Sequence, residues 1–199
     1  TVSSRKHFAF NTLLSVVTWC FPLILAFIAT PILVRGLGNE NYGIFAIALG
    51  FVSYAFSSGI GRISAKYIPE FRSSGEPEKI SEVVSTSFAL TLAVGTLQAV
   101  SLAVAAPSIV SDILRVAPES QANVVNALYL ASVGGLFLML GYVFQFVLQG
   151  LHRFDNLALI SNLSALLLNF GNIAIVLSGY GVSSLLLWNA IVFGLIAFL

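Results

Sequence analysis

The chain has 199 residues, of which 58% are hydrophobic and only 9% are charged. Soluble globular domains carry about 25% charged residues, so this composition and a mean hydropathy of +0.97 indicate an integral membrane protein. Nine Lys and Arg residues nearly balance eight Asp and Glu residues, which argues against a nucleic-acid partner. A single cysteine, Cys20, excludes an internal disulfide.

Charges divide the sequence into long apolar segments, because an unpaired charge within hydrocarbon is costly. Most of these segments approach or exceed the roughly 20 residues that a spanning helix needs. The pattern predicts an all-α polytopic transmembrane helix bundle of about six spans, at residues 8–34, 43–62, 83–110, 122–150, 156–177 and 184–199. The chain begins with Thr1 and ends at Leu199 inside the sixth segment, so we expect a fragment of a longer protein.

The segments between the spans carry turn-forming residues. Residues 34–43 hold three glycines, which permit a sharp reversal, and are predicted to form a hairpin between the first two helices. The longest predicted loop is 67–81, where Pro69 and Pro77 are expected to break the helix twice. Residues 111–121 are predicted to form a short interfacial piece ended by Pro118, and 178–183 a turn.

The distribution of cations over these loops predicts the orientation in the membrane. One set of loops would hold seven of the nine cations, namely Arg5, Lys6, Arg62, Lys66, Arg72, Lys79 and Arg153. The other set would hold only Arg35 and Arg115. Because Lys and Arg accumulate in cytoplasmic loops, we expect a multi-pass protein of the cytoplasmic membrane with its N-terminus in the cytoplasm.

Small and polar side chains recur at helical spacing within five spans and should face away from lipid. The third span offers Ser87, Thr91, Gly95 and Gln98, and the fourth Gly134, Gly141, Gln145 and Gln149. These residues either join helices through close contacts or line a shared polar interior. Five stripes together favour a substrate cavity, with candidate lining residues Asn11, Ser15, Thr18, Tyr54, Ser58, Arg62, Gln145, Asn162, Asn169 and Asn172.

Arg62 is the cation of greatest interest. It lies about 28 Å along a helix that starts at Gly43, near the expected inner edge of the hydrocarbon. It is therefore either an interfacial arginine whose charged end reaches the surface or a phosphate contact at the mouth of the cavity, with Ser58 and Tyr54 deeper.

The acidic residues all fall in predicted loops or at helix ends, so we expect no buried carboxylate for proton or sodium relay. The pattern offers no metal-ligand spacing and no catalytic acid and base pair. The sequence therefore predicts no cofactor, no metal and no enzymatic activity.

Several short motifs resemble one known family. They are Asn11 in an apolar first helix, the run from Arg35 through Gly38 to Gly43, the run from Gly61 to Glu70, and Ser74, Gly75 and Glu76. In this order they resemble the start of polysaccharide biosynthesis proteins of the Wzx type, in the superfamily that also holds multidrug extruders and lipid II flippases. The resemblance implies two six-helix lobes around a central cavity, with residues 1–199 as the N-terminal lobe.

The resemblance also implies a function. Proteins of this type flip polyprenyl-diphosphate-linked oligosaccharides, the precursors of O-antigen, capsule or exopolysaccharide, across the cytoplasmic membrane. The expected partners are the lipid bilayer, the lipid-linked glycan and the C-terminal lobe of the same chain. Residues 8–34 carry no charge, unlike the cationic first helix of lipid II flippases or the acidic one of many multidrug extruders. A multidrug or metabolite antiporter on the same scaffold and a non-transporting helical membrane subunit stay open as alternatives.

Overall fold

A computed structural model describes the backbone of residues 2–54 and 61–197, with side chains from residue 20 onward except those of residues 54, 61 and 77. The described part forms six α-helices and one π-helix: α1 Val2–Tyr54, α2 Gly61–Ser73, α3 Pro77–Ser108, η2 Ile109–Ile113, α4 Pro118–Gly150, α5 Phe154–Leu177 and α6 Val182–Ala197. Among the described residues, four stretches are long and apolar enough to cross a membrane, and α6 is a shorter apolar helix. The prediction of an all-α polytopic membrane bundle is confirmed.

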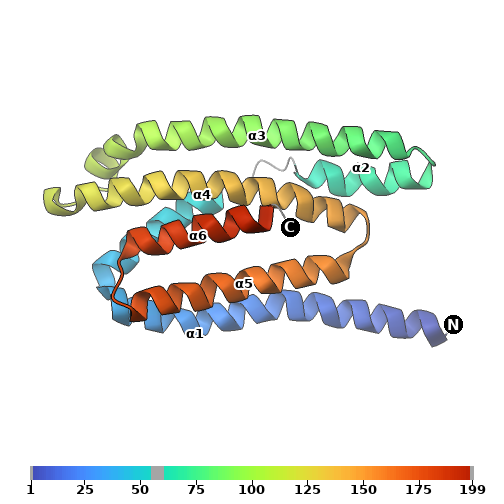
Figure 1. Cartoon of the computed structure of the whole chain (residues 1–199), viewed down its shortest axis with the longest axis horizontal. Helices are drawn as coiled ribbons and strands as arrows, with labels where there is room; N and C mark the ends of the chain where they lie inside the picture. Colours follow the sequence, from blue (N-terminus) through green and yellow to red (C-terminus); the bar gives the residue numbers. More distant parts are fainter. Residues whose placement is uncertain (1, 55–60, 198–199) are drawn as a thin grey trace.

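The helices run back and forth along the long axis of the bundle (Figure 1). The N-terminus, the α2–α3 turn and the α4–α5 turn lie at one end, which we call the near end. The reversal within α1, the α3–α4 connection and the α5–α6 turn lie at the opposite end, which we call the far end. Consecutive crossings therefore alternate in direction, as in a membrane protein with short connections.

The reversal within α1 takes a single residue. Gly38 has φ 78° and ψ 164° and is the one position in α1 that departs from helical geometry, in a region that essentially only glycine occupies. The predicted hairpin over 34–43 is thus much tighter than expected, because the residues on both sides of Gly38 stay helical. The Asn41 amide donates to the Leu37 carbonyl at 3.1 Å, which replaces a helical hydrogen bond lost at the break.

The second crossing differs from its expected span of 43–62. The helix after Gly38 ends at Tyr54, and α2 continues in the same direction from Gly61 to Ser73 (Figure 1). The predicted loop over 67–81 is therefore wrong, because only residues 74–76 lie between α2 and α3. Pro69 is accommodated inside α2, where the fully buried Ile68 packs on Gly150 of α4. Tertiary packing here outweighs the local tendency of proline to end a helix.

An apolar core toward the far end joins five helices with η2. Its buried members are Ala29, Leu33, Ile44, Phe45, Ala48, Val52, Ala106, Val110, Val124, Ala127, Leu128, Ala131, Val176, Val182, Leu185 and Leu186. The Ser120 hydroxyl donates to Glu40 at 2.6 Å and joins the start of α4 to the α1 reversal. Residues 111–121 include the end of η2 and the start of α4, so Pro118 begins a helix and does not end one.

Two of the predicted polar stripes pack against neighbouring helices. In α4, Gly134 and Gly141 let the backbone of α6 approach closely. In α3, Ser87 accepts a hydrogen bond of 3.1 Å from Ser64 of α2, and Gly95 lies against side chains of α4. These contacts fit the first interpretation of the stripes, in which small residues and short hydroxyl groups hold membrane helices together.

Candidate substrate cavity

Three asparagines lie on one face of α5. Asn162, Asn169 and Asn172 are separated by seven and three residues, a spacing that keeps side chains on the same side of a helix. Asn172 is only 8% exposed, and the other two are partly buried. This face of α5 therefore turns at least one amide into the protein interior.

Asn169 and Asn172 line a partly open cavity of about 250 Å³ between α1, α5 and α6. The other lining residues with polar groups are Thr30 and Tyr42 of α1 and Asn189 of α6. Apolar side chains complete the wall, namely Ala26, Ala29, Leu33, Phe45, Leu49, Leu168 and Phe193. We call this cavity the amide pocket, because three amides supply most of its polar groups.

The polar groups of the amide pocket are only partly satisfied. The Asn169 amide donates to the Ala165 carbonyl at 2.8 Å, and the Thr30 hydroxyl to the Ala26 carbonyl at 2.7 Å. The Oδ1 atoms of Asn172 and Asn189 are buried and have no hydrogen-bond partner within the described part of the chain. Leaving such a group unpaired costs about 1–3 kcal/mol, and native proteins rarely retain it without a functional or solvent partner.

The relative position of the two buried amides is fixed by their neighbours in the chain. Trp188, next to Asn189, donates its indole N–H across the helix contact to the Leu167 carbonyl at 2.9 Å. The indole ring lies over Gly171, next to Asn172, where a Cβ would come within 2.0 Å of its nitrogen. Only a residue without a side chain admits this ring, so the contact sets the register of α5 against α6.

Asn189 was not found by the sequence analysis. It is the single amide side chain in α6 and forms no stripe with other polar residues. With 3% of its surface exposed, it is nevertheless the most buried of the pocket amides. A lone asparagine within an apolar helix was the available signal, because membrane helices rarely carry a polar group without a partner or a function.

Arg62 lies deeper than its sequence position suggested. It begins α2, which continues to Ser73, so it does not mark the near-end boundary of the second crossing. Ser64 of α2 lies opposite Ser87 of α3, and α2 runs toward the near end while α3 runs away from it. Arg62 is therefore about seven helical residues, or about 10 Å, farther from the near end than Glu82 of α3.

Arg62 also shares one face of α2 with Lys66 and Glu70, at spacings of four residues, and all three side chains are exposed. We call this the charged face of α2. Charges at this depth are unfavourable toward lipid. The structure does not bring Arg62 into the amide pocket, because α2 packs mainly on α3 and α4.

The remaining candidate residues lie outside the amide pocket or have side chains that the structure does not describe. Gln145 is partly buried in α4 and does not line the amide pocket, and Asn162 also lies outside it. The backbones of Asn11, Ser15, Thr18 and Tyr54 belong to α1, but their side chains are not described, and Ser58 lies outside the described residues. Within residues 2–54 and 61–197, no group of three or more His, Cys, Asp or Glu residues is placed to hold a metal ion.

The apolar crossings and the uncharged polar pocket define a multi-pass helical membrane protein. Residues 8–199 match the model of the family described as polysaccharide biosynthesis protein, and the chain belongs to that family. The resemblance seen in the sequence motifs is therefore confirmed, and it places the chain in polysaccharide synthesis or transport. Comparisons with curated proteins and with solved structures gave no significant match.

Proposed function

We propose that this protein moves a polyprenyl-diphosphate-linked oligosaccharide across the cytoplasmic membrane. The amide pocket is the observation that carries the proposal. Asn172 and Asn189 each present a buried acceptor oxygen without a partner, and sugar hydroxyl groups are donors of matching strength. An uncharged lining binds a neutral glycan without the desolvation penalty that a buried carboxylate or ammonium group would add.

The charged face of α2 supplies a separate contact for the diphosphate. Arg62 can form paired hydrogen bonds with phosphate oxygens, and Lys66 follows one helical turn closer to the near end. A second lobe facing α2 would exclude lipid from these charges, in the manner of a two-lobe transporter. Glycan and phosphate would then contact different helices of the bundle, as a long amphiphilic substrate requires.

The distribution of charge supports an orientation with the near end in the cytoplasm. Five cations, namely Arg5, Lys6, Arg72, Lys79 and Arg153, belong to the N-terminal end of α1, the α2–α3 turn and the α4–α5 turn, whereas Arg35 and Arg115 belong to the α1 reversal and the α3–α4 connection. This asymmetry follows the positive-inside rule. The amide pocket, whose lining includes residues close to the α1 reversal, would then lie toward the outer half of the membrane.

The proposal is tested by reconstituting the full-length protein in vesicles that contain a fluorescent polyprenyl diphosphate oligosaccharide. Movement of the glycan between leaflets is followed by its access to an external glycosidase. We expect Arg62→Ala and Asn189→Leu each to slow movement at least tenfold, while Gln149→Leu, an exposed control on α4, keeps the wild-type rate. Wild-type rates in both site variants would overturn the assigned roles. Proton-coupled export of an organic cation without glycan movement would favour the antiporter alternative.

A further inference from the structure

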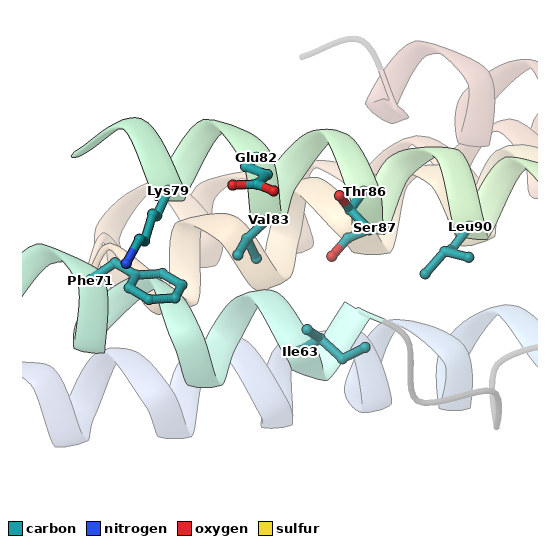
Figure 2. Close-up of a pocket in the computed structure, with 8 residues that line it drawn as sticks. All are labelled: Ile63, Phe71, Lys79, Glu82, Val83, Thr86, Ser87 and Leu90. Carbon is teal, nitrogen blue, oxygen red and sulfur yellow. The ribbon is translucent and has the colours of Figure 1, made fainter. Parts of the chain in front are cut away.

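A second hollow lies at the near end, between α2 and α3, away from the amide pocket (Figure 2). Its volume is about 270 Å³, and it is open to the surface of the bundle. Ile63 and Phe71 of α2 line one side of the hollow. The other lining residues follow one another along a face of α3, namely Lys79, Glu82, Val83, Thr86, Ser87 and Leu90. We call this hollow the α2/α3 groove.

The side chains that line the groove change from charged to polar to apolar along α3. Lys79 and Glu82 lie at its near end, the hydroxyl groups of Thr86 and Ser87 follow, and Leu90 closes the series (Figure 2). Glu82 is also the last charged residue of α3 before the apolar stretch that can cross a membrane. The charged part of the groove therefore lies where the polar surface of a bilayer would meet its hydrocarbon.

The same helical face continues beyond the groove as an exposed apolar stripe. Leu90, Val94, Leu97 and Val104 recur at spacings of three, four or seven residues. All four side chains are exposed, from 38% at Val94 to 75% at Val104. The head group, ester groups and acyl chains of a single lipid would therefore contact the charged, polar and apolar parts of this face in order.

The charged and polar side chains of the groove have hydrogen-bonding capacity that is not used within the described part of the protein. Lys79 contacts both carboxylate oxygens of Glu76, at 2.9 and 3.0 Å, and lies 5.6 Å from the centre of the Phe71 ring. An ammonium group can donate three hydrogen bonds, so one donor remains for a ligand. Glu82 has no ion-pair partner among the described residues. The hydroxyl groups of Ser64 and Ser87 are hydrogen-bonded at 3.1 Å, and Ser87 is only 1% exposed, so the exposed Thr86 supplies the hydroxyl group that a ligand can reach.

We propose that the α2/α3 groove binds a zwitterionic phospholipid whose head group carries a primary ammonium, as in phosphatidylethanolamine. Lys79 pairs with the phosphate, and Glu82 pairs with the ammonium. The two residues are three positions apart on α3 and therefore neighbours on the helix surface, so a single head group can contact both. An anionic head group fits less well, because Glu76 and Glu82 outnumber Lys79. A trimethylated ammonium cannot donate the hydrogen bond that Glu82 accepts.

The test uses the full-length protein in mixed micelles with equal amounts of dioleoyl phosphatidylethanolamine, phosphatidylcholine and phosphatidylglycerol. Native mass spectrometry then counts the lipids that stay bound. We expect phosphatidylethanolamine to be retained about fivefold over each of the others, the effect of one partly exposed ion pair. Glu82→Gln should abolish this preference.

Glu78→Gln is the matched control, because Glu78 is an exposed carboxylate in the first turn of α3 but does not line the groove. This variant should keep the full preference. Equal retention of the three lipids by the wild type, a preference for phosphatidylglycerol, or an equal loss in the Glu78 and Glu82 variants would overturn the proposal.

Discussion

The contact between Gly171 and Trp188 offers the sharpest test of the packing that shapes the amide pocket. In Gly171→Ala, the added methyl group would lie 2.0 Å from the Trp188 indole nitrogen and 2.3 Å from a ring carbon. The indole must therefore move and give up its hydrogen bond to the Leu167 carbonyl. Because Asn172 and Asn189 adjoin these residues, their separation should change as well.

The expected magnitude follows from three terms. Overpacking costs about 1–3 kcal/mol, and a hydrogen bond between membrane helices contributes about 0.6 kcal/mol. Replacing glycine by alanine inside a helix returns about 1 kcal/mol. Gly171→Ala should thus lower the free energy of unfolding by about 0.5–2.5 kcal/mol. Trp188→Phe, which keeps most of the ring volume and loses the donor, should lower it by less than about 1 kcal/mol.

The assay is unfolding of the full-length protein by SDS, followed by the loss of native helical circular dichroism. Gly43→Ala is the control, because Gly43 lies in the helix after Gly38 and a Cβ there meets no atom within 4 Å. It should be neutral or stabilising. In a Trp188→Ala background the cost of Gly171→Ala should disappear. Equal unfolding free energies for Gly171→Ala and Gly43→Ala would refute the described contact.

Three other changes test separate features of the structure. Gly38→Ala should destabilise by about 1–3 kcal/mol through backbone strain alone, since a Cβ there has open space around it; unfolding free energies equal to wild type would contradict the left-handed turn. A double-mutant cycle of Ser64→Ala and Ser87→Ala should give a coupling of about 0.6 kcal/mol, and a coupling of zero would exclude their hydrogen bond. Asn172→Leu should keep or raise stability, because it removes an unpaired buried oxygen, yet it should slow glycan movement in the vesicle assay; loss of stability with normal movement would show a purely structural residue.

The sequence alone predicted a helical membrane protein and the ends of most helices, because charged residues are costly inside a membrane and therefore mark helix boundaries. Charge-free segments located α3, α4 and α5 closely, and the turn over 178–183 contains the end of α5 and the start of α6. The second crossing was predicted poorly for the opposite reason. In α2 the charges Arg62 and Lys66 lie within a helix, so a rule that places charges at helix ends stopped the span too early.

Part of the amide pocket follows from helical spacing. This spacing places Asn169 and Asn172 on one face of α5, and both line the pocket. Spacing within one helix cannot show which other helix completes the site, so Asn189 was overlooked. The same limit applies to Gly95 of α3 and to Gly134 and Gly141 of α4, which belong to the predicted stripes and pack on neighbouring helices.

The most direct test of the amide pocket as a substrate site is thiol labelling of Asn172→Cys in the full-length protein. Cys20, which is exposed, and any cysteine outside this chain would first be replaced by serine. A small water-soluble thiol reagent should modify the new cysteine in membranes, and added lipid-linked oligosaccharide should slow that modification at least fivefold. A cysteine that stays unmodified, or that reacts at the same rate with and without the glycan, would contradict the account.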